Sequence, residues 1–158
     1  MTIRVGFGYD VHAFAPDRPL VLGGITIPFR YGLSGHSDAD AVIHAIVDAL
    51  LGAAALGDIG RHFPSSDPRW QDQPSAVFLD YSYDLLQQHG WRISNVDATI
   101  VAEQPKLSPY VDAMCQHLAE HLHLDVDQVS VKATTTDGLG FAGRSEGIAC
   151  YAVALIEK

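Results

Sequence analysis

Residues 37–55 read Ser-Asp-Ala-Asp-Ala-Val-Ile-His-Ala-Ile-Val-Asp-Ala-Leu-Leu-Gly-Ala-Ala-Ala and form the most strongly patterned stretch of the chain. Its large apolar residues recur at helical spacing and make one stripe, which consists of Ile43, Ile46, Val47, Leu50 and Leu51. Ser37 followed by Asp40 resembles a capping box. The stretch therefore predicts a long helix, capped by Ser37, with one apolar face.

The residues that precede this helix predict strands. Ile3 to Phe14 alternates as a strand does, and Gly6 and Gly8 within it indicate close approach of another backbone. Residues 20–27 predict a hairpin whose two-residue turn is Gly23-Gly24, because glycine tolerates positive φ.

The residues that follow predict two more helices, three more strands and a long loop. The helices are expected at residues 75–89 and 108–124, and the strands at 91–103, 128–135 and 147–156. Residues 56–74 predict an irregular loop, and a loop of that length in a compact domain is usually functional or mobile. This mixture predicts an α+β sandwich, a mixed β-sheet with helices on one face, in a single domain over residues 1–158.

The composition is that of a folded protein, with 47% apolar and 18% charged residues among 158. A formal net charge of −9 without a basic cluster argues against nucleic-acid binding. No uninterrupted apolar run is long enough for a membrane span, and the N-terminal residues lack signal or transit features, so we expect a cytoplasmic protein. Cys115 and Cys150 lie in apolar patterns and are expected to be reduced.

Three residues of the N-terminal third suggest a metal site. Asp10 and His12 are two positions apart in the predicted strand, so their side chains point the same way, and His44 lies in the predicted helix. Three protein ligands and an open fourth position are what a catalytic Zn²⁺ site requires. Asp48, four residues after His44, lies where its carboxylate can accept a hydrogen bond from a ligating imidazole. The alternatives are a chance Asp-x-His pair, a core histidine and a solvated Asp48.

Other polar motifs indicate anion binding. His36 and Ser37 precede the helix, where backbone N–H groups favour anions, although Ser37 alone would also serve as a cap. Thr134 to Thr136 and then Asp137 end a strand near Arg144, which suits a site for phosphate and a divalent metal, or reflects strand propensity alone. His117-Leu-Ala-Glu-His121 matches an inverted zinc-protease motif but is interpreted as the polar face of a surface helix.

The ordered motifs together resemble the 2-C-methyl-D-erythritol 2,4-cyclodiphosphate synthase family of the non-mevalonate isoprenoid pathway. The resemblance covers nearly the whole chain. It rests on Gly-Tyr-Asp-Val-His at 8–12, Gly-His-Ser-Asp-Ala-Asp at 35–40 with His44, Gly-Asp-Ile-Gly at 57–60, Phe-Pro at 63–64, Gln-Pro-Lys at 104–106, Lys-Ala-Thr-Thr-Thr at 132–136 and Gly-Arg-Ser-Glu-Gly-Ile-Ala at 143–149.

The resemblance implies a metal-dependent lyase that releases CMP by intramolecular phosphate attack. It implies Zn²⁺ on Asp10, His12 and His44, with Mg²⁺ or Mn²⁺ on Asp137 and the substrate phosphates. It also implies that His36 and Thr135 stabilise the transition state. The substrate-binding residues would be Asp10, His12, His36, Ser37, Asp58, Ile59, Gly60, Phe63, Pro64, Ser65, Ser66, Asp67, Ala102, Glu103, Gln104, Pro105, Lys106, Leu107, Ser108, Thr134, Thr135, Thr136, Asp137, Phe141 and Arg144.

The family further implies a homotrimer with its active sites between neighbouring subunits. Phe141, Arg144 and Glu146 would lie toward the threefold axis, where some members bind isoprenoid diphosphates. Two other functions stay open: a metal-dependent phosphohydrolase that uses the same ligands, and a non-enzymatic trimer that binds isoprenoid diphosphates.

Overall fold

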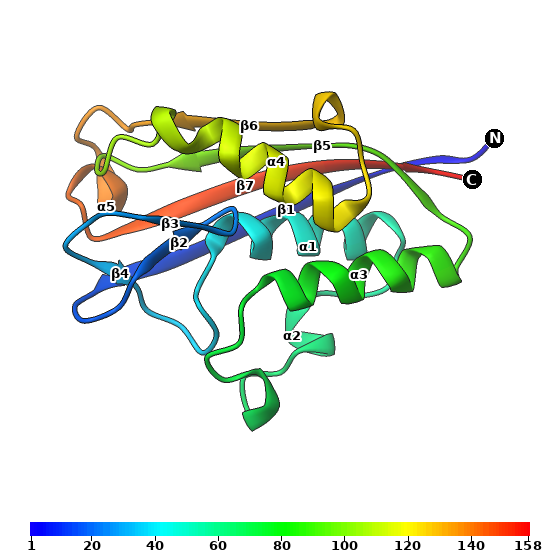
Figure 1. Ribbon diagram of the computed structural model, residues 1–158, viewed down its shortest axis with the longest axis horizontal. Helices are drawn as coiled ribbons and strands as arrows, with labels where there is room; N and C mark the ends of the chain where they lie inside the picture. Colours follow the sequence, from blue (N-terminus) through cyan, green and yellow to red (C-terminus); the bar gives the residue numbers. More distant parts are fainter.

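Two long strands, β1 (Ile3–Ala15) and β7 (Gly147–Glu157), run antiparallel in the middle of a five-stranded sheet in the computed structural model, which describes residues 1–158. The other strands are β4 (Gly32–Leu33), β5 (Arg92–Val101) and β6 (Val129–Thr134). The order is β4-β1-β7-β5-β6, and only β5 and β6 are parallel (Figure 1). The predicted mixed sheet is therefore confirmed.

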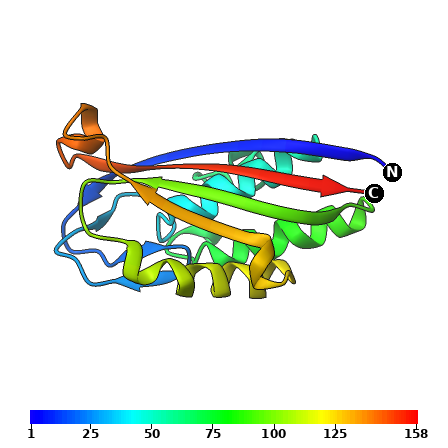
Figure 2. The same ribbon diagram turned by 90° about the horizontal axis from the view of Figure 1, so that it is seen from above.

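Three helices cover one face of this sheet and leave the other face open (Figure 2). They are α1 (Ala41–Ala53), α3 (Ala76–Gln88) and α4 (Val111–Leu122). A separate hairpin, β2 (Leu20–Leu22) and β3 (Ile25–Ile27), lies on the helical side. The core is one cluster of 39 buried residues between sheet and helices. None of the helices combines the length and the apolar composition that a membrane-spanning helix requires.

Gly6 and Gly8 bring β1 and α1 into backbone contact, as their position in the predicted strand indicated. A Cβ atom on Gly6 would lie 1.8 Å from the carbonyl oxygen of Ala49, and one on Gly8 would lie 1.8 Å from that of Ala45. Only a residue without a side chain fits either position. The two glycines thus set how closely α1 approaches the sheet.

The prediction that the helix begins with a Ser37 cap was wrong. Ala39 has a positive φ of 58°, and Asp40 is the residue that caps α1, with its side chain accepting from Ile43 N. The carboxylate of Asp40 also accepts from the backbone N–H groups of Gly23 and Gly24, at 2.9 and 2.7 Å. Asp40 therefore joins the hairpin turn to α1, which sequence periodicity does not reveal.

The predicted loop at 56–74 contains short ordered turns. They are α2 (Ile59–His62) and the 3₁₀ turn η1 (Pro68–Trp70). The ring of Phe63 lies 4.4 Å from that of Phe78 on α3, and Trp70 packs edge-on against Phe63 at 5.1 Å. These aromatic contacts tie the loop to α3, so it is less irregular than its sequence suggests. The remaining short elements are η2 (Ser108–Tyr110), η3 (Val126–Gln128) and α5 (Gly140–Gly143).

The open face of the sheet is apolar along β1 and β7. Seven large apolar side chains there are between 41% and 65% exposed: Ile3, Val5, Phe7, Tyr9, Val11, Tyr151 and Val153. Phe7 pairs with Val153 and Tyr9 with Tyr151 across the two strands, so the side chains form a continuous strip. Isolated soluble proteins rarely expose a continuous apolar strip of this kind.

Candidate active site

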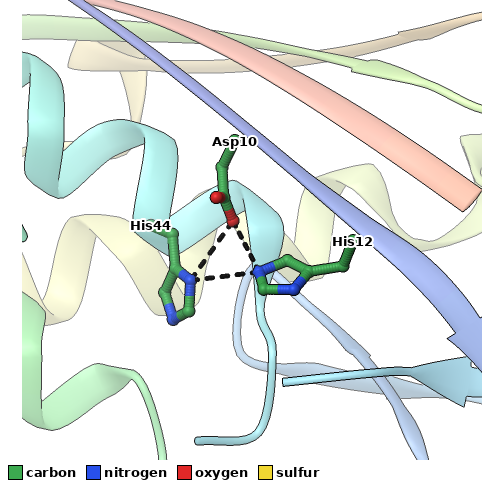
Figure 3. Close-up of side chains that lie close together, drawn as sticks. All are labelled: Asp10, His12 and His44. Carbon is green, nitrogen blue, oxygen red and sulfur yellow. Dashed lines mark hydrogen bonds and ion pairs between the residues drawn. The ribbon is translucent and has the colours of Figure 1, made fainter. Parts of the chain in front are cut away.

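Asp10, His12 and His44 meet between β1 and α1 (Figure 3). The Nε2 atom of His12 lies 2.7 Å from Oδ2 of Asp10, and Nδ1 of His44 lies 3.2 Å from the same oxygen. The two ring nitrogens are 3.3 Å apart. Strand alternation orients Asp10 and His12 alike, and the close approach of α1 supplies His44. The structure thus brings together the three residues predicted as zinc ligands.

The donor atoms of this group suit a cation. Nδ1 of His12 lies 2.7 Å from the carbonyl oxygen of Ser34, which only accepts, so Nδ1 carries the proton and Nε2 presents a lone pair. That lone pair faces Oδ2 of Asp10, which is buried and has no hydrogen-bond partner. A buried acceptor among lone pairs is costly unless a cation binds there, and the three donor atoms lie within 4.8 Å of one another.

Protonation of the group reflects the same geometry. Burial would raise the pKa of Asp10, but the adjacent imidazoles of His12 and His44 outweigh it and lower that pKa to about 2. Burial also lowers the pKa of His12, whereas its contact with Asp10 raises it, with a net rise. Asp10 therefore stays ionised over the physiological range, as a metal ligand must.

Asp48 does not support His44, contrary to the prediction. Its Oδ1 accepts from the backbone N–H of Ile59 at 2.8 Å, so the carboxylate joins α1 to the start of α2. Both ring nitrogens of His44 already have other neighbours: Nδ1 faces Asp10, and Nε2 lies 2.9 Å from Oγ of Ser75. The i+4 spacing permitted the contact, but the side chain of Asp48 turns toward the following loop.

A pocket of about 250 Å³ opens beside the three residues. Its lining consists of His12, His36, Ser37, His44, Ile59, Gly60, Phe63, Ser65, Trp70 and Phe78. Eight of these were predicted site residues, whereas Trp70 and Phe78 were missed, because an aromatic residue in a loop or on a helix carries no chemical signature in sequence. Asp58, also predicted, instead caps α2 by accepting from Arg61 N at 2.8 Å.

The segment around His36 is fixed by two further contacts. Nε2 of His36 lies 3.2 Å from the carbonyl oxygen of Asp67, so the imidazole touches the 56–74 loop. The guanidinium of Arg18 donates to the carbonyl oxygens of Gly35 and Ser37, at 2.7 and 2.6 Å. Arg18 therefore holds the backbone in place on both sides of His36 through these two hydrogen bonds. Sequence reasoning missed Arg18, because a lone arginine in a turn has no distinctive pattern.

A second pocket of about 420 Å³ lies where the parallel strands β5 and β6 end. It is lined by Ala102, Glu103, Gln104, Pro105, Lys106, Leu107, Ser108, Ala133, Thr134 and Thr135. This set contains the whole predicted segment 102–108 together with two of the predicted threonines. The structure therefore gathers these residues around one cavity.

Glu103 organises the loop that follows β6. Its carboxylate accepts from the backbone N–H groups of Thr136 and Gly138, at 3.0 and 3.2 Å, and these bonds lower the pKa of Glu103. Asp137 lies between Thr136 and Gly138 in that loop and is exposed, with a φ of 54°. Its carboxylate accepts a hydrogen bond from Thr135 Oγ1 at 3.4 Å. Asp137 therefore lies beside the second pocket, on a loop held by Glu103.

The two pockets share no lining residue. One lies between β1, α1 and the 56–74 loop, and the other lies at the ends of β5 and β6, with β7 between them in the sheet. Within one chain, the predicted substrate residues therefore form two separate groups. Phe141, Arg144 and Glu146 line neither pocket, and Arg144 pairs with Glu146 at 2.9 Å near α5.

The histidines of the protease-like motif form no metal group. Nδ1 of His121 lies 2.7 Å from Oδ1 of Asp80, and the ring of His117 packs against the Gly24 turn. Asp10, His12 and His44 are the only such group found in the chain. Glu120 is exposed, as the predicted surface face of the helix requires, whereas His117 is half-buried against the hairpin.

Fold and site together define an α+β protein that carries a three-residue group able to hold a metal ion beside a small pocket. The sequence matches the YgbB family over residues 3–157, and the chain belongs to that family. It is 57% identical over 156 residues to the 2-C-methyl-D-erythritol 2,4-cyclodiphosphate synthase of Syntrophomonas wolfei, with 99% of both chains covered.

Two further comparisons agree. The synthase of the same name from Moorella thermoacetica is 56% identical over 154 residues, which cover 98% of this chain and 94% of that one. A solved 2C-methyl-D-erythritol-2,4-cyclodiphosphate synthase in its CDP-bound form superimposes with a TM-score of 0.89 at 36% identity, covering 98% and 100% of the two chains.

Proposed function

We propose that this chain converts 4-diphosphocytidyl-2-C-methyl-D-erythritol 2-phosphate into 2-C-methyl-D-erythritol 2,4-cyclodiphosphate and CMP, a step of isoprenoid precursor biosynthesis. An oxygen of the 2-phosphate attacks the β-phosphorus of the diphosphate in the same molecule. The bond from that phosphorus to the bridging oxygen breaks, and the oxygen leaves with CMP. The convergence of Asp10, His12 and His44 beside a pocket carries this proposal, together with near full-length similarity to synthases of that name.

The residues of the chain suit a reaction whose nucleophile is already ionised. No strong general base is needed, and the main obstacle is the repulsion between two phosphate groups. A divalent cation on Asp10, His12 and His44 would offset this repulsion and polarise a phosphoryl oxygen. His36, which lines the same pocket, would contact the phosphates, and Arg18 fixes the backbone on either side of it.

We assign the two pockets to the two ends of the substrate. Ile59, Gly60 and Phe63 would contact the methylerythritol part beside the metal group. Residues 102–108 and Thr134 would surround the cytidine, and Thr135 would stabilise the transition state. Holding both ends fixes the nucleophile in line with its target, which lowers the barrier by up to about 7–11 kcal/mol in well-oriented reactions.

We further propose Zn²⁺ for the site of Asp10, His12 and His44. One carboxylate oxygen and two imidazole nitrogens are a donor set that zinc favours. A second cation, Mg²⁺ or Mn²⁺, would be held by Asp137 and the substrate phosphates, because these ions favour few carboxylates and several phosphate oxygens. Asp137 is exposed and free to approach such a ligand.

A homotrimer would complete the site. The apolar strip on β1 and β7 suits burial against further copies of the chain. The two pockets, separate within one chain, would then be joined across the subunit boundary, with the cytidine pocket of one subunit facing the metal group of its neighbour. Phe141, Arg144 and Glu146 would lie near the threefold axis. The cytoplasmic location of the protein stays a prediction.

³¹P NMR with the intact substrate, Zn²⁺ and Mg²⁺ tests the reaction. We expect paired cyclic-diphosphate doublets and CMP with the unaltered chain, and neither with His44→Ala. Release of inorganic phosphate would favour the phosphohydrolase, which uses the same ligands to activate water. An unchanged substrate spectrum, with isoprenoid diphosphate still bound, would favour the binding protein.

A further inference from the structure

Ser75 lies where a serine ordinarily caps a helix, yet its hydroxyl does not cap α3. It is the N-cap residue of that helix, is fully buried and makes no side-chain capping bond. Its Oγ atom instead donates to Oδ1 of Asp38 and lies 2.9 Å from Nε2 of His44. Capping therefore does not account for this serine.

The direction of these hydrogen bonds determines which nitrogen of His44 carries a proton. The hydroxyl of Ser75 has one proton, and the carboxylate of Asp38 accepts it. Toward His44 the same oxygen can only accept, so Nε2 is the protonated nitrogen. Nδ1 is then left with a lone pair, 3.2 Å from Oδ2 of Asp10.

Asp38 is itself held in place from two sides. Its Oδ2 accepts from the backbone N–H of Ser75 at 2.9 Å, and its Oδ1 accepts from that of Asp40 at 3.1 Å. Its own N–H donates to the carbonyl oxygen of Gln73 at 3.2 Å. The carboxylate is thus fixed to the starts of both α1 and α3. Ser37 Oγ also lies 3.2 Å from Nε2 of His44, but no carboxylate receives its proton.

We propose that Asp38 and Ser75 form a positioning relay that holds His44 as the Nε2–H tautomer and aims its Nδ1 at the metal ion. The relay deepens the proposed metal centre and rests on it. His12 achieves the same result more simply, through the carbonyl oxygen of Ser34. Groups that orient a ligating imidazole in this way typically change metal affinity about 10–100-fold when they are removed.

Two measurements test the relay without using enzyme activity. The first is ¹⁵N NMR of histidine-labelled, metal-free protein at mildly alkaline pH, which reports the tautomer of His44. The second is Zn²⁺ affinity by competition with a chromophoric chelator. The variants are Ser75→Ala, Asp38→Asn and, as a matched control, Ser82→Ala. Ser82 is a fully buried serine of the same helix, and its hydroxyl donates to the carbonyl of Phe78 at 2.8 Å.

We expect the Nε2–H tautomer in the unaltered chain and a mixture in Ser75→Ala and Asp38→Asn, with Zn²⁺ affinity about 10–100-fold lower in both. Ser82→Ala should keep both properties. An Nδ1–H tautomer in the unaltered chain would overturn the relay even if no variant folds, as would equal losses of affinity in Ser75→Ala and Ser82→Ala. Asp10→Ala separates the two proposals. If Zn²⁺ still binds to Asp10→Ala, the proposed metal centre is contradicted. If Asp10→Ala abolishes Zn²⁺ binding and Ser75→Ala leaves it unchanged, only the relay is contradicted.

Discussion

Gly8 lies against Ala45 so closely that a Cβ atom on Gly8 would be 1.8 Å from the carbonyl oxygen of Ala45. Ala45 follows His44, so this contact sets the height of a proposed metal ligand above the strand that carries Asp10 and His12. The packing of backbone on backbone is therefore part of the site.

Gly8→Ala should push α1 away from β1. We expect a loss of about 3 kcal/mol in the free energy of unfolding, because the clash is with backbone and cannot be relieved by a rotamer change. Zn²⁺ affinity should fall as His44 is displaced. Gly52→Ala is the matched control: nothing lies within 4 Å of its added Cβ atom, so helix propensity should stabilise the protein by about 0.5–1 kcal/mol. Urea unfolding measures both, and equal effects would contradict the contact.

Asp40 should give the metal-free protein a stability that falls as pH rises. Burial and the nearby Asp38 raise the pKa of Asp40 from 3.8 to about 6, although three backbone N–H groups oppose the shift. Because the folded state binds this proton more tightly than the unfolded chain, the stabilisation is present below pH 3.8 and is lost as pH rises through 6. The full difference is about 3 kcal/mol.

Urea unfolding at pH 4 to 7 with a chelator, for the unaltered chain and Asp40→Asn, isolates this effect. The variant should be less stable throughout, since its amide opposes the N–H of Gly24. Its stability should decline less with rising pH, because only Asp48 and His12, whose pKa values are also raised, still contribute to the decline. Asp10, whose pKa is lowered to about 2, stabilises the folded state in the opposite sense. Its contribution is lost only as pH falls below about 4, which lies outside the measured range. Parallel pH profiles for the two proteins would contradict the shift.

Phe7→Glu should weaken the proposed trimer. Phe7 is 62% exposed in the apolar strip, so burial in an interface would leave a glutamate there desolvated and unpaired. Analytical ultracentrifugation should give three chain masses for the unaltered protein and a lower mass for the variant. Gln88→Glu adds the same charge to an exposed position on α3 and should leave the mass unchanged. A monomeric unaltered chain would contradict the trimer.

Mixing two inactive variants should restore activity if the active site is shared between subunits. His44→Ala removes a proposed metal ligand, and Ala133→Phe places a ring in the second pocket. In a cyclic trimer of both kinds, one site combines an intact metal group with an intact pocket from the neighbour. We expect CMP release from co-refolded mixtures and none from either parent. Mixed trimers that stay inactive would contradict an active site shared between subunits.

Arg18→Ala should impair catalysis more than folding. The variant loses both bonds to the backbone on either side of His36, so kcat/KM should fall about tenfold, which corresponds to about 1.4 kcal/mol. Arg92→Ala removes an arginine that pairs with Glu157 at the other end of the sheet and serves as the control. An unchanged kcat/KM in Arg18→Ala would show that the backbone around His36 keeps its conformation without the two hydrogen bonds from Arg18.

Most elements of the fold were predictable, because local periodicity determines them. Alternation located β1, helical spacing located α1 and α3, and Gly23-Gly24 formed the turn that positive φ permits, at 59° and 78°. The start of α1 was misplaced, because the capping role of Asp40 depends on a hairpin 16 residues earlier in the chain as well as on its own helix.

The sequence by itself determined which residues are the candidates for the chemistry. Asp10 and His12 share a strand face by alternation alone, and ordered motifs named His44, the 102–108 segment and the threonines. Only the tertiary structure decided that Asp48 faces Ile59, that Ser75 joins Asp38 to His44, and that the two pockets are separate within one chain. The physical reason is range: periodicity acts between near neighbours in sequence, whereas these contacts join segments that meet only when helices pack on the sheet.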